Sequence, residues 1–218
     1  MEQLFALPSD KQPDQFDIIV DALFKSGYAI LPNAFSESWT DKLFFHLKTI
    51  SEASFKKAGI GRGQDYQVNQ FIRTDEIAWI DQTDASLRPY LTWIEELRLR
   101  INQQLFLGLF DYECHFAHYP RGSFYKRHYD AFKGCETKRV VTTILYLNPL
   151  WEVDNGGELI LYRENSLEVL EKISPHYAKL VVFLSEKFPH EVLTTQRDRY
   201  SLTGWFKTNT SESPLISM

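Results

Sequence analysis

The sequence is poor in cysteine and has no long apolar run. Its two cysteines, Cys114 and Cys135, are too few for a disulfide framework or a zinc ribbon and indicate a reducing compartment. No stretch approaches the about 18 uninterrupted apolar residues that a membrane helix needs. The first residues also lack the basic and apolar pattern of a signal peptide. We therefore predict a soluble, cytoplasmic protein with no membrane partner.

Basic charge is also in short supply. The 24 Lys and Arg residues are outnumbered by 29 Asp and Glu, which gives a formal net charge of −5. Phosphate backbones are bound by basic surfaces, so we expect no nucleic-acid partner. Hydrophobic residues make up 44% of the 218 residues, enough for a buried core, and no internal repeat is visible. One domain over 1–218 is the prediction, with helical support in 1–110, a catalytic core in 111–207 and a frayed tail in 208–218.

The first half has apolar residues at helical spacing. This pattern predicts helices in DQFDIIVDALFKSG, SESWTDKLFFHLKTIS and SLRPYLTWIEELRLRINQQLF. Gly27 is expected to end the first helix, Ser36 to cap the second, and Pro89 to lie at the start of the third. Phe24 belongs to the predicted buried stripe of the first helix. Before the third helix, a Gly-rich polar stretch predicts a mobile loop over 59–72 that leads into a short strand.

From about residue 111 the pattern changes to alternation of β-branched and aromatic residues with polar ones. The strand-like runs are YECHFAHY, SFYKRHYD, RVVTTILYLN, GELILY, KLVVFLS, HEVLTT and RYSLTGWFK. Turn signals such as YPRG and KFPH separate them. Many short strands after a helical half predict an α+β, mainly β fold, in which a β-sandwich or barrel is buttressed by the helices.

The run KRHYDAF places a histidine and an aspartate two residues apart in a predicted strand. His128 and Asp130 then share one face. If that face is the interior, the carboxylate needs a cation, because burying an unpaired charge is costly. No Lys or Arg lies two residues from Asp130 to supply one. A metal ion would neutralise the carboxylate, although this tripeptide is common by chance and a third ligand is required.

The other histidines are His46, His115, His118, His176 and His190. His46 lies on a predicted helix and His176 follows a proline in a loop, whereas His190 opens a predicted strand. Together, His128, Asp130 and His190 match the 2-His-1-carboxylate facial triad, which leaves coordination positions open and is typical of non-haem Fe(II) oxygenases.

Arg199 follows His190 in HEVLTTQRDRYSLTGWF. An oxygenase of this type uses a co-substrate that chelates the metal, and a dicarboxylate needs an anchor for its far end. The planar, permanently charged fork of arginine suits that purpose. Thr203 is expected on the same face and could add a hydroxyl donor. An exposed strand arginine is the alternative, which we expect for Arg197, and the triad favours the anchor for Arg199.

These segments resemble a known family. YPRGSFYKRHYD, RVVTTILYLNPLW, GGELILY, FPHEV and RYSLTGWF occur in family order, with IRTDEIAWID upstream. Over roughly residues 60–207, the chain resembles bacterial-type Fe(II)- and 2-oxoglutarate-dependent dioxygenases of the prolyl hydroxylase domain (prolyl 4-hydroxylase) family. The resemblance implies a double-stranded β-helix (jelly roll) with supporting N-terminal helices. It implies Fe(II), 2-oxoglutarate and O₂ as cofactors and co-substrates, with ascorbate as a further candidate.

The resemblance also implies site roles, residue by residue. The iron ligands are His128, Asp130 and His190, and Arg199 binds the distal carboxylate of 2-oxoglutarate with Tyr146. Tyr119 and Thr203 belong to the same pocket, and Leu159 and Val192 complete its wall. The substrate or lid residues are Arg73, Asp75, Tyr125, Arg139 and Trp205, with Asp75 expected to pair with Arg139. His115 falls at a position that is apolar in the animal enzymes, and no role is assigned to it.

The implied reaction is hydroxylation of a prolyl residue in a flexible protein segment, giving succinate and CO₂. A translation elongation factor is the candidate substrate by resemblance alone. The segment from Tyr119 to His128 is one residue shorter than in the animal oxygen-sensing enzymes, so substrate choice is expected to differ. Three alternatives stay open: an oxygenase of small molecules, a non-catalytic cupin-like metal-binding module, and a zinc hydrolase. The last two would need no dicarboxylate anchor.

Overall fold

The structure, a computed structural model, describes residues 14–59, 69–81, 83–131 and 139–209. Most of the predicted loop, most of the predicted tail and Cys135 lie outside these ranges. In the described part of the chain, no helix is long and apolar enough to span a membrane.

The three predicted helices are confirmed as α1 (Gln15–Ser26), α2 (Glu37–Thr49) and α3 (Arg88–Leu105). Helix α1 begins after Asp14, whose carboxylate accepts a hydrogen bond from the Asp17 amide at 2.8 Å. It ends at Gly27, whose φ of 84° is the left-handed conformation that glycine adopts without strain. The prediction for Phe24 was wrong: its side chain is 78% exposed, because the buried stripe runs through Ile19, Val20 and Leu23.

The strands form two antiparallel sheets. The large sheet has the order β1-β9-β6-β11-β4-β3-β2 and the small one the order β5-β10-β7-β8. The strands of the large sheet are β1 (Tyr28–Leu31), β9 (Leu180–Leu184), β6 (Arg139–Tyr146), β11 (Arg199–Thr208), β4 (Leu109–Tyr119), β3 (Glu76–Trp79) and β2 (Lys56–Lys57). Those of the small sheet are β5 (Tyr125–His128), β10 (His190–Val192), β7 (Leu159–Tyr162) and β8 (Val169–Ile173). Every predicted run contains a strand, whereas β1, β2 and β8 were not predicted.

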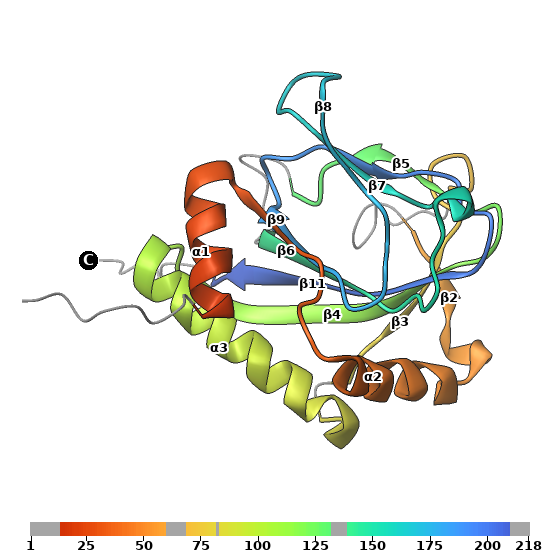
Figure 1. The fold of residues 1–218 in the computed structure, drawn as a ribbon, viewed down its shortest axis with the longest axis horizontal. Helices are drawn as coiled ribbons and strands as arrows, with labels where there is room; N and C mark the ends of the chain where they lie inside the picture. Colours follow the sequence, from red (N-terminus) through yellow and green to blue (C-terminus); the bar gives the residue numbers. More distant parts are fainter. Residues whose placement is uncertain (1–13, 60–68, 82, 132–138, 210–218) are drawn as a thin grey trace, which may run out of the picture.

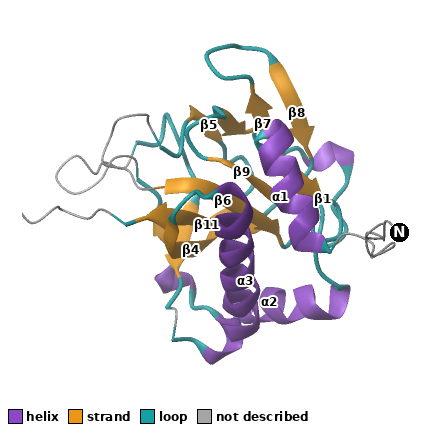
Figure 2. Cartoon of the chain, turned by 90° about the vertical axis from the view of Figure 1, so that its left-hand side faces the viewer, coloured by secondary structure: helices purple, strands orange, loops and turns teal. Residues whose placement is uncertain are grey.

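The molecule has three layers. In Figure 1, α2 and most of α3 lie below β4, and β5, β7 and β8 lie above it; in the view turned by 90° (Figure 2), α2 again lies below the large sheet and β5, β7 and β8 above it. Strand β4 shows how alternation builds two cores. Phe116 joins the core against the helices, and Ala117 and Tyr119 join the core between the sheets. Two antiparallel sheets with supporting helices confirm the predicted jelly roll.

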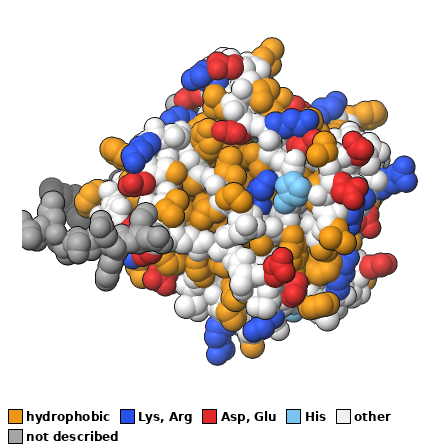
Figure 3. Space-filling model, in the orientation of Figure 1, with side chains coloured by type: hydrophobic (Ala, Val, Ile, Leu, Met, Phe, Trp, Pro, Cys, Tyr) orange, Lys and Arg blue, Asp and Glu red, His pale blue; other side chains and the backbone are white. Residues whose placement is uncertain are grey.

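The face shown in Figure 3 carries charged side chains of both signs. Lys and Arg are interspersed with Asp and Glu, and hydrophobic side chains gather near the middle of the view. On this face neither sign forms a continuous field.

Candidate active site

Two of the predicted metal ligands are brought together by strand pairing. His128 ends β5 and His190 begins β10, and they lie directly opposite each other in the antiparallel ladder. Such pairs hold their Cβ atoms about 5 Å apart, and here the two ring centroids are 4.3 Å apart. The predicted strand through Asp130 was wrong. Strand β5 stops at His128, because its partner β10 begins at His190 and leaves the following residues without a ladder partner.

Asp130 nevertheless completes the group. Its Oδ1 lies 3.7 Å from His128 Nε2, and its Oδ2 lies 3.6 Å from His190 Nε2. One possible ligand atom from each of the three residues lies within 4.8 Å of the others. The side chains of His128, Asp130 and His190 are only 15%, 9% and 5% exposed, so water competes little for these atoms.

Backbone carbonyls set the protonation of both imidazoles. His128 Nδ1 lies 2.8 Å from the Lys126 carbonyl oxygen, and His190 Nδ1 lies 3.0 Å from that of Phe188. A carbonyl only accepts, so Nδ1 carries a proton in each ring and Nε2 is the nitrogen that faces Asp130 and is left to bind a metal. Burial, followed by the neighbouring His190, lowers the pKa of His128 to about 3, which keeps that ring neutral.

The carboxylate of Asp130 is the charged member of the group. Burial acts to raise its pKa, but the two imidazoles and the Arg139 guanidinium outweigh burial and lower the pKa to about 2. Thr142 on β6 donates a hydrogen bond from Oγ1 to Asp130 Oδ2 at 2.8 Å. Two imidazole nitrogens and a carboxylate oxygen are the donor set that non-haem Fe(II) sites use, so the residues fit that metal.

Arg199 begins β11 and is a buried cation. It is 1% exposed, and its Nε donates to the Gly157 carbonyl oxygen at 2.8 Å. Its guanidinium carbon lies 4.9 Å from the centre of the Tyr119 ring and 5.0 Å from that of Tyr146. Within the described ranges no carboxylate pairs with Arg199. A buried guanidinium is stable only with an anion, so this end of the site fits a carboxylate ligand.

Tyr146 points to the same conclusion. Its hydroxyl is buried beside the Arg199 guanidinium, and the hydroxyl proton has no acceptor in the described part of the chain. Burial raises the pKa of Tyr146 to about 12, with Arg199 acting in the opposite direction, so the phenol stays a donor. An unsatisfied donor beside an unpaired guanidinium fits the distal carboxylate of 2-oxoglutarate.

The Gly156–Gly157 pair does more than form the predicted turn. Both residues have positive φ, 64° and 65°. A Cβ atom on Gly157 would lie only 3.1 Å from Arg199 Cδ and 3.1 Å from Thr195 Cβ. Glycine at this position therefore lets Arg199 reach the Gly157 carbonyl, which the sequence pattern alone did not indicate.

Alternate residues of β11 face the space between the sheets. Thr203 shares the face of Arg199, as predicted, and its Oγ1 lies 3.2 Å from Ser201 Oγ. Ser201 is buried and was missed; reading every second residue from Arg199 would have found it. Trp205, two residues beyond Thr203, is also buried, and its indole N–H lies near enough to Asp130 to help lower the pKa of that carboxyl, although it makes no hydrogen bond of normal geometry in the described ranges.

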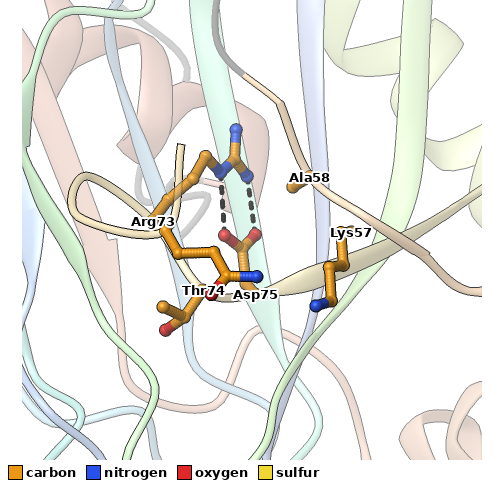
Figure 4. Close-up of a pocket in the computed structure, with 6 residues that line it drawn as sticks. Lys57, Ala58, Arg73, Thr74 and Asp75 are labelled. Carbon is orange, nitrogen blue, oxygen red and sulfur yellow. Dashed lines mark hydrogen bonds and ion pairs between the residues drawn. The ribbon is translucent and has the colours of Figure 1, made fainter. Parts of the chain in front are cut away.

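The predicted pair of Asp75 with Arg139 was wrong. Asp75 is bound instead by Arg73, with Nε–Oδ1 and Nη2–Oδ2 distances of 2.8 and 2.6 Å (Figure 4). Arg139 pairs with Glu113, at 2.8 Å from Nε to Oε1, and its guanidinium lies 3.6 Å from the centre of the Trp205 ring. The physical reason is proximity, since Arg73 stands two residues from Asp75 and Glu113 stands near Arg139 across β11.

Arg73 also reaches toward the metal ligands. Its guanidinium carbon lies 4.1 Å from the centre of the Tyr125 ring, and Tyr125 stacks on His128 with centroids 3.5 Å apart. Backbone bonds fasten the same segment, since the Lys126 amide donates to the Ile72 carbonyl at 2.8 Å. A cavity of about 160 Å³ adjoins Arg73 and Asp75. The end of the predicted loop is thus attached to β5, beside His128.

The other residues considered from the sequence lie partly in the core between the sheets and partly away from the site. His115 is buried between Trp79 and Trp205, at ring-centroid distances of 5.0 and 5.2 Å, and its Nδ1 has no partner in the described ranges. Leu159 and Val192 lie in the core between the sheets. The three histidines outside the site are His46 on α2, His118, which stacks on Tyr200, and exposed His176.

Comparison with known proteins agrees with this geometry. The model of the 2OG-Fe(II) oxygenase superfamily matches residues 114–207. A prolyl-4-hydroxylase from Pseudomonas putida is 37% identical, with a TM-score of 0.80 over 89% of this chain and 100% of that one. A Trichoplax adhaerens prolyl hydroxylase, solved with a peptide fragment of hypoxia inducible factor, is 31% identical, with a TM-score of 0.76 over 88% of each chain. Mouse prolyl hydroxylase EGLN3 is 27% identical over 90% of this chain and 85% of its own length.

The superfamily model matches only residues 114–207, whereas the similarity to the Pseudomonas putida enzyme covers 89% of this chain. Members of the superfamily use Fe(II), 2-oxoglutarate and O₂, and the donor set and the buried cation described above fit the first two. The chain belongs to the prolyl hydroxylase family of Fe(II)- and 2-oxoglutarate-dependent oxygenases.

Proposed function

We propose that the chain hydroxylates a prolyl residue in a flexible segment of a protein substrate, with His128, Asp130 and His190 as the iron ligands. One observation carries the assignment: three donor atoms lie within 4.8 Å of one another in the same inter-sheet space as Arg199, a buried arginine that pairs with no carboxylate among the described residues. When bound, Fe(II) with 2-oxoglutarate and O₂ supplies the oxidising power for C–H hydroxylation, and succinate and CO₂ are the co-products.

The protein's own residues orient the co-substrate. Arg199 offers its planar fork to the distal carboxylate, and the Tyr146 hydroxyl donates a second bond to it. The guanidinium of Arg199 packs over the ring of Tyr119. Burial of all three side chains keeps water from competing for these bonds.

The substrate side of the proposed site is aromatic and basic. Arg139 lies over Trp205, and Arg73 lies over Tyr125, which in turn packs on His128. Aromatic faces pack against a proline ring, and guanidinium groups donate to peptide carbonyls. The peptide-bound structure of the Trichoplax relative supports a protein substrate for this chain. A translation elongation factor is the specific candidate to test.

The test is oxidation of proteins in a soluble lysate of the cell that makes this chain. Purified protein is supplied with Fe(II), 2-oxoglutarate and O₂, and peptides are searched by mass spectrometry for a proline that gains one oxygen atom. We expect such a proline with the wild-type chain and none with Asp130→Ala. Oxidation of small metabolites alone would favour the small-molecule oxygenase, and metal binding without any succinate would favour the cupin-like module.

A further inference from the structure

The three proposed iron ligands are not held equally by the backbone. His128 and His190 stand in a ladder pair, and each ring is fixed by a carbonyl oxygen, at 2.8 Å from Lys126 and 3.0 Å from Phe188. Asp130 stands beyond the end of β5 and has no ladder partner. Its orientation therefore depends on side-chain contacts.

Thr142 supplies such a contact from a rigid position. It lies in the middle of β6, fully buried, paired on one side with Trp205 and on the other with Phe183. Its Oγ1 lies 2.8 Å from Asp130 Oδ2, the oxygen that also faces His190 Nε2. A hydrogen bond to a carboxylate is stronger than one between neutral groups, so this bond can fix the rotation of the carboxylate.

Ser185 extends the contact by one hydroxyl. Its Oγ lies 2.9 Å from Thr142 Oγ1, it is fully buried, and its amide donates to the Val140 carbonyl at 2.9 Å. A carboxylate only accepts, so the single proton of the Thr142 hydroxyl goes to Asp130. The Ser185 hydroxyl must then donate to Thr142. The bonds run in one direction, from Ser185 through Thr142 to Asp130, and each strengthens the next.

We propose that Thr142 and Ser185 form a hydroxyl relay that holds Asp130 in its metal-binding orientation. This inference rests on the proposed role of Asp130 as an iron ligand. Both are positioning residues, because they act on the metal only through Asp130. Groups that orient ligands in this way change metal affinity by about 10- to 100-fold when they are removed.

The test is the dissociation constant of Fe(II) for the full-length apoprotein, measured by anaerobic calorimetry with Fe(II) alone. Thr142→Val keeps the shape and removes the hydroxyl, and we expect binding at least about tenfold weaker. Thr142→Ser restores the hydroxyl and is expected to bind nearly as tightly as wild type. Ser185→Ala leaves the Thr142 bond in place but unsupported, so a smaller loss is expected.

Thr143→Val is the matched control. Thr143 is the next residue of the same strand, equally buried, and its hydroxyl contacts Tyr112 on the opposite face, 2.8 Å away. Its loss should lower the melting temperature without changing the Fe(II) dissociation constant.

Fe(II) binding by the wild-type protein tests the proposed site, and the ratios of the dissociation constants between variants test the relay. The relay is overturned if Thr142→Val binds Fe(II) within twofold of wild type, or if Thr142→Ser binds as weakly as Thr142→Val. An unchanged Fe(II) dissociation constant in Ser185→Ala would show that Ser185 is not part of the relay.

Discussion

At the scale of single residues, the site is defined by two buried polar groups whose bonding within the described residues is incomplete. The Tyr146 hydroxyl is one, and the Arg199 guanidinium, which has no carboxylate in the described ranges, is the other. A stable core avoids such groups, because each costs free energy when it is desolvated. Their presence together indicates a ligand that satisfies both.

Tyr146→Phe should therefore separate stability from binding. Removal of an unsatisfied hydroxyl should leave the free energy of unfolding unchanged within about 1 kcal/mol, or raise it. The same change removes a hydrogen bond to a carboxylate, which is worth about 1.5–3 kcal/mol and corresponds to about 10- to 100-fold weaker binding of 2-oxoglutarate. Urea unfolding and the KM for 2-oxoglutarate are the two measurements. A large loss of stability with an unchanged KM would show that the hydroxyl serves the fold instead.

Gly157→Ala should weaken 2-oxoglutarate binding through Arg199. The new Cβ would press on Arg199 Cδ and Thr195, and the positive φ adds about 1–2 kcal/mol of strain. Gly108→Ala is the control, since Gly108 has a φ of 64° and open space around it. We expect both variants to lose stability and only Gly157→Ala to raise the KM for 2-oxoglutarate. An equal KM in the two variants would argue against a positioning role for Gly157.

The residue types of the site were predictable, but their partners were not. His128, Asp130 and His190 were found because a shared strand face and a buried carboxylate restrict the chemistry. The pairing of Asp75 with Arg139 failed, because ion pairs depend on which side chains end within a few ångströms of each other. Thr142 and Ser185 were missed for a related reason, since a hydroxyl in a strand has no spacing that ties it to a carboxylate elsewhere.

At the scale of elements, the pairing of β5 with β10 creates the site, and the described residues just before β3 lie beside β5. Arg73 joins the two, since it binds Asp75, lies over Tyr125 and donates to the Gly59 carbonyl. Burial acts to lower the pKa of Arg73, but the hydrogen bonds and charge of Asp75 raise it, so the guanidinium stays charged.

Asp75→Asn should destabilise the chain strongly. Its side chain is fully buried and that of Arg73 is 13% exposed, and loss of one partner from a buried pair costs about 3 kcal/mol or more. Asp21→Asn is the control, because the Asp21–Lys25 pair is exposed and contributes less than about 1 kcal/mol. The free energy of unfolding in urea measures both. Equal losses in the two variants would contradict the structural role of the Arg73–Asp75 pair.

The elements with a clear apolar pattern were predicted, including the short strands β5, β7 and β10, whereas β1, β2 and β8 were not. Helices α1, α2 and α3 carry long apolar stripes, β4 and β11 are long and partly alternating, and β6 is a run of β-branched and apolar residues. Strand β1 follows directly on the first helix, and in β8 (VLEKI) two adjacent charged residues break the alternation, so neither has a clear local signal. The end of β5 was misplaced because a strand stops where its partner stops, which is a tertiary property.

At the scale of the whole molecule, the helices support one face of the large sheet and leave the other face for chemistry. The inner faces of β4, β6 and β11 meet the small sheet across a second core, and the proposed ligands stand within that space. The fold class was predictable from the change from helical to strand periodicity near residue 111. The sheet order was not, because it depends on pairings between distant segments.

The central claim is that this space holds an Fe(II)- and 2-oxoglutarate-dependent oxygenase centre built on His128, Asp130 and His190. The most direct measurement is succinate formed from 2-oxoglutarate by protein that is loaded anaerobically with Fe(II) and then given O₂ and lysate. We predict succinate that requires Fe(II) and O₂, is stimulated by lysate, and is lost in Asp130→Ala but retained in Thr143→Val. Equal succinate from wild type and Asp130→Ala would contradict the account.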